Sequence, residues 1–151
     1  MKTVTRSLLT AALLMFGSRT AVAQTIKFTG GPSGTLQINS AVAGQNPTSA
    51  PGAGTFSTLT KGNQGTLRIQ AKLDQAMPAN TTLVLSLTYP FGTNQGAKAL
   101  GITPVDMIIS ITPPAGNNIT TVGTVSYSFT ATPSAGVVAP FSRTVTLTIG
   151  P

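Results

Sequence analysis

The sequence has no histidine, cysteine, tryptophan or glutamate, and only 7% of its 151 residues are charged. Without histidine and cysteine, the usual zinc sites and Ser-His or Cys nucleophile systems are excluded. Disulfide bonds and haem ligation by histidine or cysteine are excluded as well. The absences therefore remove most classes of enzyme and metalloprotein before any motif is considered.

Carboxylates are almost as scarce, since Asp74 and Asp106 are the only acidic side chains. A glycosidase-like pair would need both at one cleft, but each lies at the end of an expected strand. No S-x-x-K motif occurs, and the glycine-rich segment Gly92–Gly96 lacks the ending of a phosphate loop. We therefore expect no catalytic residue, no cofactor and no metal ligand, and predict that the protein is not an enzyme.

The first 23 residues have the layout of a secretory signal peptide. Basic residues precede an apolar run of ten residues, Leu8 to Gly17, and Ala21-Val22-Ala23 forms a cleavage pattern. The run is shorter than the roughly 20 residues of a spanning helix. We predict a signal helix over 1–23 and a mature chain starting at Gln24, exported to the periplasm, the cell surface or the extracellular medium.

The mature chain keeps six of the nine basic residues against two aspartates, a net charge of +4. These cations are scattered along the chain, whereas nucleic-acid binding needs a basic stripe. We expect no nucleic acid as a partner and no transmembrane segment in the mature chain. The expected partners are proteins, either further copies of this chain or a component of the cell surface.

Strict alternation of apolar and polar side chains dominates the mature chain, and it is typical of half-buried strands. Leu67, Ile69, Ala71 and Leu73, for example, alternate with polar residues. We expect strands over 25–29, 35–39, 66–74, 81–89, 106–112, 124–132 and 143–149, with a short extra strand over 55–60. In 106–112 the alternation places Met107, Ile109 and Ile111 inward.

Glycine and proline separate these segments, as in 30–34, 40–54, 90–105 and 133–141. No mature segment shows a helical apolar period over three turns. Short strands with such punctuation predict an all-β fold. We expect one domain over 24–151, an antiparallel two-sheet immunoglobulin-like sandwich of about seven to eight strands.

The leader and the alternating segments 123–130 and 143–149 resemble bacterial surface and fimbrial, pilin-type subunits with immunoglobulin-like folds. The resemblance implies a structural or adhesive role. In pilus families a subunit lends an N-terminal strand to its neighbour, which here corresponds to 24–30, with Ile26 and Phe28 as the strand-exchange side chains. Gly30-Gly31-Pro32 interrupts this short strand, so the alternative is that it completes its own sandwich.

A second function stays open, because loops often carry binding residues. The protein would then be a monomeric periplasmic or secreted binding module, with loops 90–105 and 133–141 as its contact surface and Phe91 and Phe141 as contact residues. Some Gram-positive pilins also form a Lys-Asn isopeptide bond beside a buried acid. Lys27 and Lys72 would be the candidate lysines and Asp106 the acid, but the alternation places both lysines outward.

Overall fold

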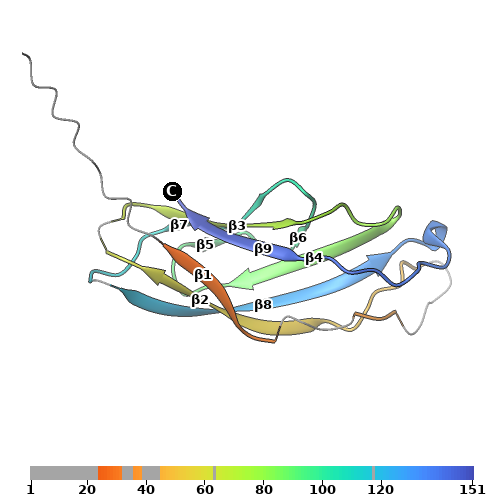
Figure 1. The fold of residues 1–151 in the computed structure, drawn as a ribbon, viewed down its shortest axis with the longest axis horizontal. Helices are drawn as coiled ribbons and strands as arrows, with labels where there is room; N and C mark the ends of the chain where they lie inside the picture. Colours follow the sequence, from red (N-terminus) through yellow and green to blue (C-terminus); the bar gives the residue numbers. More distant parts are fainter. Residues whose placement is uncertain (1–23, 32–35, 39–44, 63, 117) are drawn as a thin grey trace, which may run out of the picture.

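The computed structural model describes residues 24–31, 36–38, 45–62, 64–116 and 118–151 as two stacked β-sheets (Figure 1). The predicted leader, residues 1–23, lies outside the described residues. The strands are β1 (Thr25–Gly30), β2 (Gly52–Thr60), β3 (Leu67–Leu73), β4 (Thr81–Thr88), β5 (Thr93–Asn94), β6 (Lys98–Ala99), β7 (Val105–Ile111), β8 (Ile119–Ala131) and β9 (Val145–Gly150).

The larger sheet has the order β1-β2-β8-β4-β6 and the smaller sheet has the order β5-β7-β3-β9. Every strand pair is antiparallel. The predicted two-sheet sandwich is therefore confirmed. The only helical element in the described part of the chain is a 3-10 turn, Pro133–Ala135. The described residues thus contain no helix long and apolar enough to cross a bilayer.

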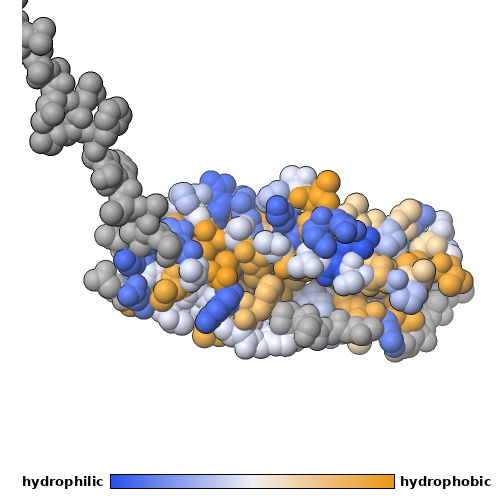
Figure 2. Space-filling model, in the orientation of Figure 1, coloured by the Kyte–Doolittle hydropathy of each residue, from blue (hydrophilic) through white to orange (hydrophobic). Residues whose placement is uncertain are grey.

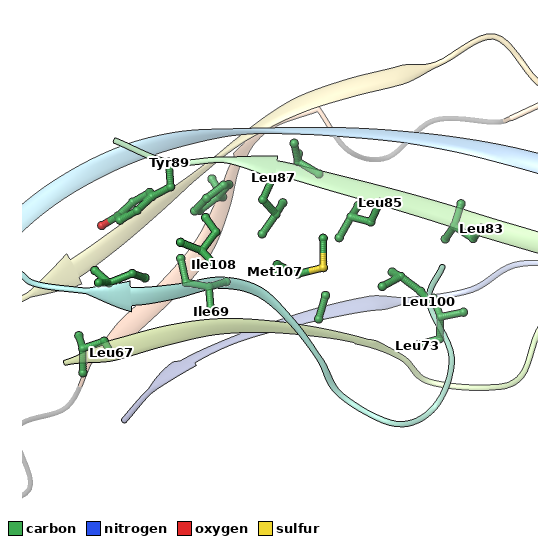
Figure 3. Packing of buried hydrophobic residues seen from close by; sticks show 14 residues of the cluster. Leu67, Ile69, Leu73, Leu83, Leu85, Leu87, Tyr89, Leu100, Met107 and Ile108 are labelled. Carbon is green, nitrogen blue, oxygen red and sulfur yellow. The ribbon is translucent and has the colours of Figure 1, made fainter. Parts of the chain in front are cut away.

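Alternation in the sequence translates directly into burial on β3 and β4. The inward side chains of β3 are at most 2% exposed, and those of β4 are at most 8% exposed. Figure 3 shows Leu85 and Leu87 of β4 pointing across the interior toward Met107 and Ile108 of β7. Burial of this apolar surface is the main contribution to the stability of a chain without disulfides.

The centre of the larger sheet packs around Phe56 of β2, which is fully buried. Its ring stacks on Tyr89, with centroids 5.8 Å apart and planes inclined by 19°. The Tyr89 hydroxyl is hydrogen-bonded to the Thr58 hydroxyl at 2.6 Å inside the core. The predicted short strand 55–60 is thus part of a nine-residue central strand.

Three expectations about strand extent were wrong. Residues 36–38, in the predicted strand 35–39, belong to no strand, because their backbone has no ladder partner. Strand β8 begins at Ile119, earlier than 124, since its first nine residues, 119–127, pair with the nine residues of β2. Two short strands, β5 and β6, lie in the predicted loop 90–105, which raises the strand number to nine.

The predicted side-chain phase fails in β7. Met107 and Ile108 are both buried, whereas Ile109 is only half-buried. The pairing of β7 with β3 shifts register twice, and Ser110 has a positive φ of 56°. A β-bulge inserts an extra residue and reverses the faces beyond it, so after the first shift Ile108 takes the inward position expected for Ile109. The second shift restores the predicted phase, and Ile111 is buried as expected.

Candidate functional site

One side of the sandwich is bordered by two edge strands. In the described residues β1 pairs only with β2, and β9 pairs only with β3. The two strands lie next to each other on the same side of the molecule (Figure 1). We call this side, made of β1 and β9, the open side.

The side chains of β9 are less covered than those of its neighbour. Val145, Leu147 and Ile149 point inward but are only half-buried, although the facing residues of β3 are fully buried. Apolar and polar surface alternate along this side in Figure 2. The core is therefore incompletely closed along β9.

The backbone of β9 can accept another strand. The amide of Asp74 donates to the Thr144 carbonyl at 3.0 Å, which makes Asp74 and Thr144 a hydrogen-bonded pair in the β3–β9 register. Because such pairs alternate in an antiparallel ladder, the backbone groups of Val145, Leu147 and Ile149 point to the free edge. These groups are a template for strand addition.

The two predicted strand-exchange residues, Ile26 and Phe28, lie on β1 at the other border of the open side. Both are half-buried and pack against the core. Their strand pairs with β2 of the same chain, with a register shift between Phe28 and Gly30. The structure thus contains the self-completed arrangement, and exchange between chains remains a prediction.

A cavity of about 1180 Å³ lies at the end of the sandwich where β4 begins and β8 ends. We call it the end cavity. Leu83 and Leu85 of β4 and Tyr127 and Phe129 of β8 line it, together with Leu36 and Ile38 and the segment 138–145. Its lining is therefore mostly apolar and comes from segments that are far apart in the sequence.

Phe141 and Arg143 line the end cavity beside one another. The Phe141 ring meets Phe129 edge-on at 5.8 Å, and the Arg143 guanidinium lies 5.0 Å from the Phe141 centroid. Arg143 Nε donates to the Ala76 carbonyl at 2.8 Å, and Nη1 donates to the Ser142 carbonyl at 2.7 Å. These contacts hold a cation in a defined orientation next to apolar surface.

The two predicted loop-contact residues are not brought together. Phe91 follows β4 and packs edge-on against Tyr89 at 5.9 Å, whereas Phe141 lies at the end where β4 begins. Phe91 is half-buried against the core, and Phe141 is 39% exposed. The loops therefore do not form one contact surface, and only Phe141 belongs to the end cavity.

The two aspartates also lie in separate contacts. Asp74 Oδ1 accepts the Thr144 amide at 2.9 Å, while Asp106 accepts Gln70 Nε2 at 2.8 Å and lies 3.9 Å from Arg68. Neither aspartate lines the end cavity. The described residues contain no cluster of three or more potential metal ligands.

The lysines considered for an isopeptide bond, Lys27 and Lys72, are both exposed. Asp106 takes its contacts from Gln70 and Arg68 on the neighbouring strand. Asp106 therefore forms ordinary surface interactions in the structure, and the Lys-Asn isopeptide bond stays a prediction.

Sequence reasoning missed the end cavity and Arg143. The cavity joins β4, β8 and the segment before β9, which no local pattern connects. A weak signal existed, since residues 132–142 carry no charge and Arg143 follows them directly. An uncharged loop followed by one cation could have indicated that this segment borders the end cavity.

Comparison with known proteins found no matching family model, no matching curated protein and no matching solved structure. The functional argument therefore depends on the chain's own geometry. The open side and the end cavity are the two features that it offers.

Proposed function

We propose that this protein is an exported, non-enzymatic structural or adhesive subunit of the cell surface, of the pilus or fimbria type. The observation that carries the proposal is the open side, where β9 pairs only with β3 among the described residues and its apolar side chains are half-buried. The leader supports export, and the scarcity of titratable groups argues against catalysis.

The physics of a sheet edge explains why this side favours association. An exposed edge offers unsatisfied N–H and C=O groups, and proteins that remain monomeric usually block it with charges, proline or bulges. β9 reads Val-Thr-Leu-Thr-Ile-Gly and contains none of these along its length. A strand from another chain would both extend the ladder and cover Leu147 and Ile149.

The test is the mass of the mature chain in solution as its concentration rises, measured by size-exclusion chromatography with light scattering. We expect concentration-dependent assemblies. Leu147→Pro should weaken association about tenfold or more, because proline removes an N–H on the free edge while the β3 ladder keeps its bonds.

Leu147→Ala is the matched control, since it also shortens the side chain but keeps the N–H. It should associate better than Leu147→Pro, and circular dichroism checks that both variants fold. A wild-type protein that is monomeric at every concentration would refute the subunit proposal. Equal association of the two variants would exclude the β9 edge as the contact.

A second candidate is a monomeric periplasmic or secreted binding module. The end cavity favours it, because a concave apolar site with a few polar groups is the common form of a ligand site. Phe141 contributes to this site, whereas Phe91 packs on the opposite end. A concentration-independent monomer that binds a ligand through Phe141 would support this candidate.

A further inference from the structure

We propose that the end cavity binds a single-chain anionic amphiphile, a long-chain fatty carboxylate. Its acyl chain would lie among the apolar side chains of β4 and β8, and its carboxylate would meet Arg143. This inference goes beyond the proposed subunit function and does not depend on it, because the open side and the end cavity are tested by different measurements.

The cavity has the size and lining that an acyl chain needs. At about 1180 Å³ it is somewhat larger than the roughly 300–1,000 Å³ of ordinary small-molecule sites. Its floor consists of Leu83, Leu85, Tyr127 and Phe129. The last two are only half-buried, so a bound chain would remove more apolar surface from water.

The floor suits hydrocarbon better than a peptide strand. β8 pairs with β2 on one side and with β4 on the other, and β4 also pairs with β6. The backbone groups of the floor are thus already used in ladders. The floor therefore offers an inserted peptide no partners for its own N–H and C=O groups, whereas an acyl chain has none to satisfy. Free backbone groups are available instead at Val145 of β9, which borders the floor.

Arg143 supplies the charge that selects an anion. In the described part of the chain the ion pair is that of Arg68 with Asp106, which leaves Arg143 without an acidic partner. The Asp74 carboxylate accepts a hydrogen bond from the amide of Thr144, the residue next to Arg143. A guanidinium held by two carbonyls can still donate to a carboxylate, a strong charge-assisted pair.

The loop before Arg143 gives the end cavity an apolar entrance. Val137 is fully exposed, and its neighbours Gly136 and Val138 line the cavity. Its position beside the cavity is consistent with the entry of an acyl chain at this loop.

The experiment titrates the mature protein with hexadecanoate, decanoate and hexadecanol, each below its micelle concentration or solubility limit, using calorimetry and NMR. We expect one saturable site for hexadecanoate, with shift changes concentrated at Tyr127, Phe129 and Phe141. Decanoate, which is six methylenes shorter, should bind at least about tenfold more weakly, because each buried methylene adds roughly a fourfold gain in affinity and two of the six suffice for that difference.

Arg143→Gln should weaken hexadecanoate about tenfold and leave hexadecanol unchanged, whereas Arg143→Lys should keep most of the affinity because it keeps the charge. Val138→Trp should block both ligands by filling the cavity. The proposal is wrong if binding is not saturable, if Arg143→Gln has no effect, or if hexadecylamine, of equal chain length, binds as well as hexadecanoate.

A second copy is the competing occupant. If the shifts of Phe129 and Phe141 change with protein concentration alone, another chain fills the cavity and the proposal is overturned. Repeating the titration with Leu147→Pro separates the two claims, since this variant is designed to lose association at β9 while its cavity stays intact.

Discussion

Gly123 lies in the middle of β8, directly beneath the ring of Phe56. A Cβ at this position would come 2.4 Å from Phe56 Cζ and 2.7 Å from the Thr88 carbonyl oxygen. Glycine inside a strand weakens the strand locally, and here it allows the stacked pair of Phe56 and Tyr89 to fit against the sheet. One missing side chain thus determines where the largest core ring can lie.

Gly123→Ala should lower the free energy of unfolding by about 1–3 kcal/mol, because the added methyl overpacks the core. Gly101→Ala is the matched control, since a Cβ there meets nothing within 4 Å, and it should change stability by less than about 0.5 kcal/mol. Urea unfolding followed by circular dichroism measures both variants. Equal midpoints for the two would contradict the proposed contact with Phe56.

Individual strands differ in how completely their inward faces are covered. β3 and β4 lie inside their sheets and bury almost all of their inward side chains, whereas β1 and β9 lie at edges and leave theirs half-buried. The sequences of β3 and β9 alternate equally well. Position in the sheet, rather than alternation, therefore determines which strands are available to a partner.

Removal of residues 24–30 should leave the rest of the domain folded but lower its free energy of unfolding by about 2 kcal/mol, since Ile26 and Phe28 are half-buried. A peptide with the sequence of β1 should restore most of the loss when added in trans. A peptide with serine in place of Ile26 and Phe28 is the control and should not.

Thermal unfolding with and without each peptide is the measurement. Rescue by the β1 peptide alone would support strand exchange, because it shows that the position next to β2 can be filled by another chain. An unchanged midpoint after truncation would instead show that β1 contributes nothing to the stability of the sandwich.

Long-range strand pairing dominates the whole molecule. β2 pairs with β1 and with β8, and β3 pairs with β7 and with β9, so most ladders join segments that are far apart in the chain. The chain must close large loops before these contacts form. Sandwiches of this kind fold more slowly than helical domains of equal size.

Refolding of the mature chain from urea should therefore take roughly milliseconds to seconds. Stopped-flow far-ultraviolet circular dichroism is the appropriate measurement, because it follows strand formation directly and the sequence has no tryptophan to report by fluorescence. Refolding within microseconds, as in helical bundles, would contradict the non-local topology.

The part of the structure that could be predicted is the part that depends on neighbouring residues. Alternation over 66–74 and 81–89 correctly predicted which side chains of β3 and β4 face the core, since successive side chains of a strand point to opposite faces. In 106–112 the same argument was right for Met107 and Ile111 but failed for Ile109, because register shifts on both sides of Ile108 turn that residue inward without a clear signal in the sequence.

The sequence by itself determined the class of fold and the poverty of chemical groups, because composition and alternation are local properties of the chain. Only the tertiary structure decided that β1 and β9 are the edges of one side. It also decided that Phe129, Phe141 and Arg143 meet at one cavity. Those arrangements depend on pairings between distant segments. Backbone hydrogen bonds form these pairings, and because almost every residue can make them, the sequence does not specify which strands pair.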